Sequence, residues 1–90
     1  MAHTIGNKTR LQARLRRIQG QTAALEKQLA EDSDCIAVLQ QIAAIRGAVN
    51  GLMAAVIEDH LLEHIVKADA LEQRQQDIDI VLQIIQSYLK

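Results

Sequence analysis

A cysteine and two histidines in this chain have the residue types and the spacing needed to bind a divalent metal ion. His60 and His64 are four residues apart, so on a helix they lie on consecutive turns and one ion can contact both. Cys35 comes 25 residues before His60, and at about 100° per residue it falls on the same helix face. A thiolate with two imidazoles suits a borderline-soft divalent ion. The three side chains are therefore a candidate metal site.

These three side chains cannot meet within one chain, because the helix between Cys35 and His60 would separate them by roughly 37 Å. Two copies of the helix could instead pack antiparallel and cross between Gly47 and Gly51. Cys35 of one copy would then meet His60 and His64 of the other, and two-fold symmetry would make two such sites. Small residues at the crossing allow two backbones to approach, although a bend at a glycine is an alternative explanation.

Further nitrogen donors are available near the N-terminus. His3 lies on a short arm before the first helix, and removal of Met1 before the small Ala2 would leave a free amine beside it. Additional nitrogen ligands favour five- or six-coordinate nickel(II) or cobalt(II) over trigonal copper(I). Each ligand also has a plainer interpretation: solvated histidines beside Asp59 and Glu63, a small buried cysteine, and a disordered arm.

Basic residues are concentrated in the first third of the chain. Residues 1–30 carry a charge of +5 and residues 31–90 a charge of −6, although the whole chain has a net charge of only −1. Arg10, Arg14 and Arg17 share a helix edge, which suits contact with DNA phosphates. No helix-turn-helix or zinc-finger pattern is visible, so DNA would be bound by the flat helical surface of an oligomer. An ordinary solvated helix face is the alternative interpretation.

The elements that must position these residues are all predicted to be helices. The chain has 90 residues, 49% of them hydrophobic, one aromatic residue and no proline, which excludes a β-sandwich or barrel. Apolar stripes with helical spacing predict one domain, residues 1–90, with an arm over residues 1–6 and helices over residues 7–31, 34–66 and 70–89. We expect Ser33 to cap the second helix and Thr4 or Asn7 the first. The stripes of the first and third helices comprise Leu11, Leu15, Ile18, Thr22, Leu25 and Leu29, then Ile78, Val81, Leu82, Ile85 and Leu89.

Length, composition and motifs also indicate what class of protein this is. A chain of this length buries little core by itself, so we expect a homo-oligomer. The chain opens without a signal sequence, and Glu58, Asp59 and Glu63 interrupt its most hydrophobic region, so we expect a cytoplasmic protein without a membrane span. No nucleophile and base stand at a useful spacing, and no glycine-rich phosphate loop is present, so we expect neither enzymatic activity nor a small-molecule substrate.

Several segments resemble the CsoR/RcnR family of small helical bacterial repressors, and most closely its nickel/cobalt-responsive members. The segments that carry the resemblance are residues 14–21 (RLRRIQGQ), Cys35, residues 38–53, His60 with His64, and residues 87–90 (SYLK). The resemblance implies a disc-shaped tetramer, a dimer of antiparallel dimers, that binds operator DNA when metal-free and releases it when nickel(II) or cobalt(II) binds, so that a metal-efflux gene is expressed. It implies the metal ligands His3, Cys35, His60 and His64. It also implies DNA contacts by Arg14 and Arg17, aided by Arg10, Lys8, Arg16 and Arg46.

The same residues distinguish this chain from related sensors. Copper(I) sensors resemble it but have a second cysteine in place of His64, and persulfide sensors need two thiols where this chain has only Cys35. Formaldehyde sensors are similar but have proline in place of Ala2 and usually an acid in place of His64. Three alternatives remain: a formaldehyde-responsive repressor acting through Cys35, a metal-storage or chaperone protein that does not bind DNA, and a helical scaffold without metal.

Overall fold

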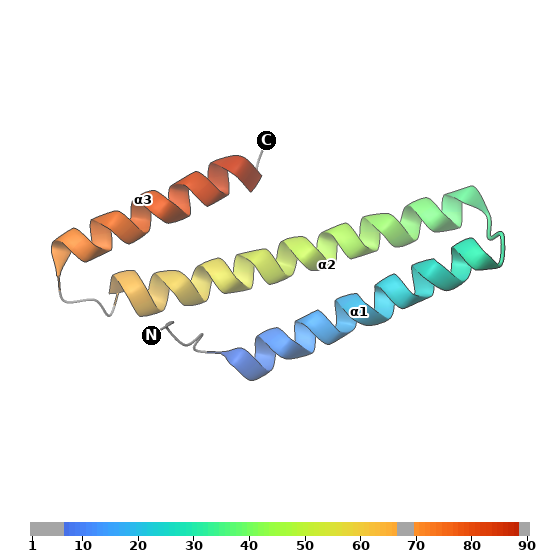
Figure 1. Cartoon of the computed structure of the whole chain (residues 1–90), viewed down its shortest axis with the longest axis horizontal. Helices are drawn as coiled ribbons and strands as arrows, with labels where there is room; N and C mark the ends of the chain where they lie inside the picture. Colours follow the sequence, from blue (N-terminus) through green and yellow to red (C-terminus); the bar gives the residue numbers. More distant parts are fainter. Residues whose placement is uncertain (1–6, 67–69, 89–90) are drawn as a thin grey trace. The chain divides into compact units, whose positions relative to one another are not determined.

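The computed structural model describes residues 7–66 and 70–88, so His3, Thr4, residues 67–69 and Leu89 lie outside the described residues. Every regular element in the described part is helical, which confirms the predicted three-helix, all-α fold (Figure 1). The first helix is one residue shorter than expected at each end and the second and third begin one residue later than expected, while the second continues into a π-helical turn that ends at the expected residue 66. The elements are α1 (Lys8–Ala30), α2 (Cys35–Leu61), a π-helical turn η1 (Leu62–Val66) and α3 (Leu71–Tyr88).

The chain divides into two compact units, and the boundary falls within α2. The first, which we call the α1–α2 unit, comprises residues 7–55, and the second, the α3 unit, contains residues 56–66 and 70–88. In the α1–α2 unit the two helices run antiparallel (Figure 1). The Gln41 amide nitrogen on α2 donates a hydrogen bond to the Gln21 carbonyl on α1 at 2.9 Å, while Leu11 and Ile18 of α1 are buried. This packing determines which edge of α1 stays exposed.

A Schellman motif ends α1 and turns the chain toward α2. The Ser33 N–H donates to the Gln28 carbonyl at 3.0 Å, and the Asp32 N–H donates to the Leu29 carbonyl at 3.5 Å. This motif requires one residue with positive φ, and Asp32 has φ of 54°. Glycine is the usual residue there, but aspartate tolerates the left-handed region better than most L-residues. The predicted break at residues 31–34 is therefore observed.

The residue that caps α2 is not the one expected. Ser33 is wrong as the N-cap, because α2 begins at Cys35 and the Asp34 side chain accepts a hydrogen bond from the Ile36 N–H at 3.4 Å. The Asp34 carbonyl also accepts the first helical hydrogen bond, from the Val38 N–H. Ser33 instead completes the Schellman motif through its backbone. At the start of α1, Asn7 occupies the N-cap position, without a capping hydrogen bond from its side chain.

Only part of each predicted apolar stripe is buried within the chain. Leu15 and Leu29 of α1 are 45% and 60% exposed, and Thr22 is exposed, with its hydroxyl donating to the Gln19 carbonyl. Thr22 is therefore not a core residue, because its side chain is exposed. In α3, Val81 is buried and Ile78 and Leu82 are exposed. Each helix has at most one neighbouring helix within its unit. One neighbour covers only part of the width of the apolar stripe, so the rest of the stripe stays exposed.

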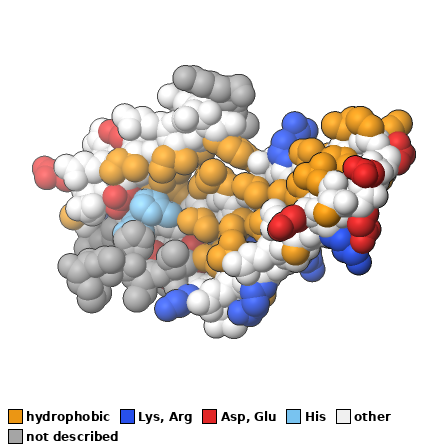
Figure 2. All heavy atoms as spheres, turned by 45° about the vertical axis from the view of Figure 1, so that its right-hand side comes forward, with side chains coloured by type: hydrophobic (Ala, Val, Ile, Leu, Met, Phe, Trp, Pro, Cys, Tyr) orange, Lys and Arg blue, Asp and Glu red, His pale blue; other side chains and the backbone are white. Residues whose placement is uncertain are grey.

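Exposed apolar side chains lie along α2 as well as along α3. By length and composition alone, Cys35–Ile65 could cross a membrane, because Arg46 is the only charged residue between Cys35 and Ile57. Glu58, Asp59 and Glu63, which we expected to interrupt the most hydrophobic region, lie near the C-terminal end of this stretch and leave residues 36–57 without an acid. Ile36 and Leu39 are 61% and 59% exposed, and Figure 2 shows hydrophobic side chains over a broad part of the surface. The neighbouring α1 therefore leaves these apolar side chains of α2 exposed.

Candidate metal and DNA sites

Two histidines come together in the α3 unit. His60 lies at the end of α2 and His64 in η1, and their ring centroids are 4.5 Å apart with the ring planes tilted by 34°. Both residues are half-buried. Metal–nitrogen bonds of about 2.0–2.1 Å place two ligating nitrogens about 3 Å apart, which rings at this separation can reach. His60 and His64 therefore lie close together, as their spacing predicts. His64 belongs to a π-helical turn, a feature that is frequent at functional sites.

A buried acid on α3 faces the second histidine. Asp77 is only 8% exposed, and its Oδ2 lies 4.0 Å from His64 Nδ1. The Gln73 amide nitrogen donates to both carboxylate oxygens, at 3.4 and 3.3 Å. A carboxylate beside Nδ1 favours the tautomer with its proton on that nitrogen, which leaves the Nε2 lone pair for a metal ion.

Sequence reasoning missed Asp77, although a signal for it was present. The residue lies one helical turn before the buried Val81, so an acid stands on the face of α3 that should be apolar. A buried carboxylate is costly unless it is paired or hydrogen-bonded. An acid at such a position therefore points to a polar partner on the neighbouring element, here η1, against which α3 packs.

The cysteine stands apart from the histidines along α2. Cys35 is the first residue of α2 and is exposed, while His60 is near its last. Within the described part of one chain, no three His, Cys, Asp or Glu residues form a group able to hold a metal ion. The side chains suited to a divalent ion therefore lie in two separate places on one chain: the imidazole pair His60 and His64, and the exposed thiol of Cys35. His3 lies outside the described residues.

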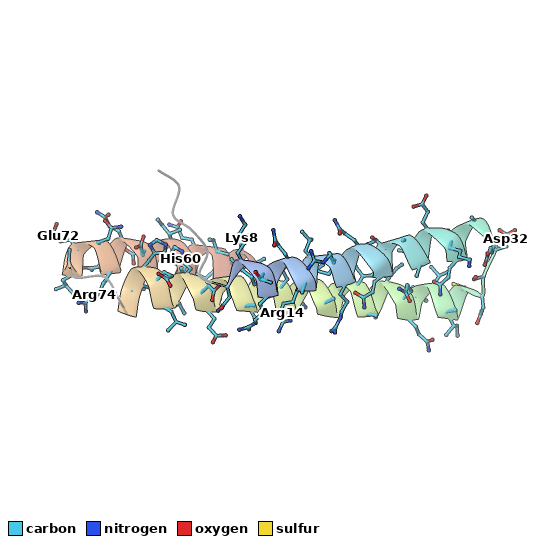
Figure 3. The ribbon with its side chains drawn as sticks, turned by 90° about the horizontal axis from the view of Figure 1, so that it is seen from below. Lys8, Arg14, Asp32, His60, Glu72 and Arg74 are labelled. Atoms are coloured by element: carbon cyan, nitrogen blue, oxygen red, sulfur yellow. The ribbon has the colours of Figure 1, made fainter. Side chains whose placement is uncertain are left out.

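Three arginines of α1 surround one hollow in the α1–α2 unit. Arg10, Arg14 and Arg17 line it together with Ala13, and its volume is about 280 Å³. Figure 3 shows Arg14 on the side of α1 next to α2. Among the described residues, none of the three guanidinium groups forms an ion pair with a carboxylate. Lys8 and Arg16 on α1 and Arg46 on α2 are exposed.

Comparison with known proteins identifies a family and close relatives. A family model described as "metal-sensitive transcriptional repressor" matches residues 7–87. The transcriptional repressor RcnR of Salmonella paratyphi B is 56% identical over 90 residues, covering all of both chains. An RcnR homolog of Escherichia coli O139:H28 is 57% identical over the same length, again covering both chains completely.

Solved structures with the same fold include sensors of different effectors. A variant of the formaldehyde-responsive regulator FrmR from Salmonella enterica serovar Typhimurium is 41% identical with a TM-score of 0.85, covering 97% of this chain and 99% of that one. The copper-sensing repressor CsoR with Cu(I) from Geobacillus thermodenitrificans is 26% identical with a TM-score of 0.85, covering 100% and 94%. The nickel-responsive regulator InrS is 27% identical with a TM-score of 0.76, covering 98% and 99%.

Proposed function

This chain belongs to the family of metal-sensitive transcriptional repressors, and from that premise we propose that it is a nickel- or cobalt-responsive repressor that releases its operator when the metal binds. The observation that carries the choice of effector is the convergence of His60 and His64 in the α3 unit. Two imidazoles favour a borderline divalent ion, whereas copper(I) prefers soft sulfur ligands. The full-length identity to RcnR repressors and the likeness to a nickel-responsive regulator support the same effector.

The metal ligands are His60 and His64 of one copy and Cys35 of a second, with His3 and the N-terminal amine completing the set. Cys35 begins α2 and is exposed, as a thiol that must reach another chain should be. These residues would hold nickel(II) or cobalt(II), which would supply coordinate bonds to their nitrogen and sulfur donors. Gln73 holds Asp77, and Asp77 favours the His64 tautomer that presents Nε2.

The operator-binding surface is the basic edge of α1. Arg14 and Arg17 contact DNA phosphates and base edges, with Arg10, Lys8, Arg16 and Arg46 adding favourable charge. Three arginines around one hollow, without carboxylate partners among the described residues, support this assignment. Binding through phosphates depends strongly on salt concentration, because each contact releases counterions.

The working assembly is a homotetramer, a dimer of antiparallel dimers, in the cytoplasm. The apolar side chains of α2 that one chain leaves exposed, such as Ile36, Leu39 and Val49, provide the dimer interface. Dimer formation through α2 would bury the apolar surface whose length and composition would also allow it to cross a membrane. It also brings each Cys35 to the histidine pair of another chain.

Release of DNA requires that the metal-bound and metal-free proteins differ in operator affinity. Tying Cys35 of one copy to His60 and His64 of another shifts α1, so that its arginines no longer match the phosphate spacing. Moving operator occupancy from 99:1 to 1:99 takes about 5.5 kcal/mol, or about 1.4 kcal/mol for each of four sites. A coupling of this size for each site is in the usual range for allosteric proteins.

The test is fluorescence anisotropy of labelled DNA from upstream of this protein's own gene. We expect tight, salt-sensitive binding by the metal-free protein that collapses when cobalt(II) or nickel(II) is added. Binding that ignores both metals but responds to formaldehyde would favour the second candidate, a repressor acting through Cys35, which the 41% identity to a FrmR variant supports. An absence of DNA binding would contradict the repressor assignment and favour metal storage.

A further inference from the structure

We propose that Gly51 is a positioning residue for Arg14, an inference that rests on the proposed binding of operator DNA by α1. A β-carbon built on Gly51 would lie 3.2 Å from Nη1 of Arg14, closer than ordinary van der Waals contact. The guanidinium of Arg14 therefore rests directly against the backbone of α2. Gly51 lacks the one side-chain atom that would push it away.

Backbone conformation does not explain a glycine at this position. Gly51 lies within a continuous stretch of α2, and no glycine in the described residues has positive φ. Glycine lowers the stability of a helix interior relative to alanine, so its presence needs a gain elsewhere. Gly47, one turn earlier on the same helix, is different, because a β-carbon there would meet no atom of the chain within 4 Å. The close approach by Arg14 is thus particular to Gly51.

Arg14 connects this contact to the basic edge of α1. Its side chain lines the same hollow as Arg10 and Arg17, so the three guanidinium groups form one set of phosphate contacts. The atom nearest to Gly51 is the far end of a flexible side chain, so an added methyl group would move the guanidinium by a few tenths of an ångström and leave the helix backbone in place. Displacement changes the spacing of Arg14 from Arg10 and Arg17 but leaves the net charge unchanged.

The experiment compares Gly51→Ala with the control variant Gly20→Ala on α1, which changes the same residue type where a β-carbon would meet nothing within 4 Å. Operator affinity of the metal-free protein is measured by anisotropy over a range of salt concentrations, together with cobalt(II) affinity and oligomeric state. We expect Gly51→Ala to weaken operator binding by about tenfold, and to reduce the slope of log affinity against log salt by about 1 per lost phosphate contact. Cobalt(II) affinity and oligomeric state should not change, and Gly20→Ala should bind the operator as the unsubstituted protein does.

A double-mutant cycle with Arg14→Ala tests whether Gly51 acts through that arginine. We expect Gly51→Ala to change operator affinity by less than about twofold when Arg14 is already alanine.

The outcomes separate this inference from the proposed function. If Arg14→Ala weakens operator binding and Gly51→Ala does not, or if the two effects add fully, Gly51 does not position Arg14 and the inference is overturned. If Arg14→Ala leaves operator binding unchanged, the assignment of the α1 edge to DNA is itself wrong. A loss of operator binding by Gly51→Ala that accompanies a changed oligomeric state would also overturn the inference, because the substitution would then act on assembly.

Discussion

An acid buried beside a histidine is the residue-scale feature that sets this site apart from a pair of solvated imidazoles. Asp77 is removed from water, is held by Gln73 and lies 4.0 Å from His64 Nδ1. The plainer interpretation of the sequence is that the two histidines are exposed beside acidic neighbours. Exposed histidines would not need a buried carboxylate next to one of them. A carboxylate behind a ligating imidazole selects the orientation of the ring.

Replacing Asp77 with asparagine should therefore weaken metal binding. We expect Asp77→Asn to lower cobalt(II) affinity by about 10- to 100-fold, the usual cost of losing the partner of a ligating histidine. Competition with a chelator of known affinity measures the change. Asp79→Asn is the matched control, because Asp79 is an exposed acid on the same helix. Equal affinities for the Asp77 and Asp79 variants would show that Asp77 does not support the site.

At the scale of elements, the turn between α1 and α2 depends on one residue in an unusual conformation. Asp32 has φ of 54°, while Glu31 before it has φ of −95°. Hydrogen bonds from Asp32 and Ser33 back to α1 close the helix, and Asp34 then opens α2. The turn sets the antiparallel course of the two helices, and so the register of Gly51 against Arg14.

Substitutions at Asp32 should affect stability according to their tolerance of positive φ. We expect Asp32→Ala to lower the free energy of unfolding by about 1 kcal/mol, because a β-carbon is strained there, and Asp32→Gly to have no destabilising effect. Glu31→Ala, at ordinary φ, is the control and should change little. Thermal unfolding at a fixed protein concentration measures each variant, since oligomer stability depends on concentration. Comparable losses for Asp32→Ala and Glu31→Ala would contradict the role of the turn.

At the scale of the whole molecule, the proposed metal site requires two chains. Cys35 is exposed at the start of α2, the histidine pair lies toward its other end, and no described group within one chain has three suitable ligands. The exposed apolar side chains of α2 provide the surface that a second copy would cover. A site divided in this way makes metal binding depend on assembly.

Mixed oligomers offer a direct test of a site shared between chains. We expect Cys35→Ala and His64→Leu each to abolish tight cobalt(II) binding when expressed alone. Co-expression should restore it, because a mixed dimer contains one intact thiol facing one intact histidine pair, and random pairing recovers about one quarter of the sites. Cobalt-to-protein stoichiometry measures the recovery, with the double variant Cys35→Ala/His64→Leu as the control. An absence of recovery in confirmed mixed dimers would show that the two chains do not share a site.

Periodicity and composition by themselves determined the helices of this protein and the side chains that share a helix face. Three helices, a break at residues 31–34, the alignment of Arg10, Arg14 and Arg17, and the pairing of His60 with His64 all follow from helical spacing along one element. The relation of Cys35 to the histidines was also predictable in part, because helix length alone keeps them apart within one chain.

Contacts between elements were decided only by the tertiary structure. The π-helical turn at η1, the burial of Asp77 beside His64 and the close approach of Arg14 to Gly51 each depend on which faces of two helices meet. Periodicity orders the residues around one helix but carries no information about the rotation and register of its neighbour. The choice of Asp34 over Ser33 as the cap is instead a local matter of where the helix begins, since α2 starts at Cys35 and Asp34 is the residue before it.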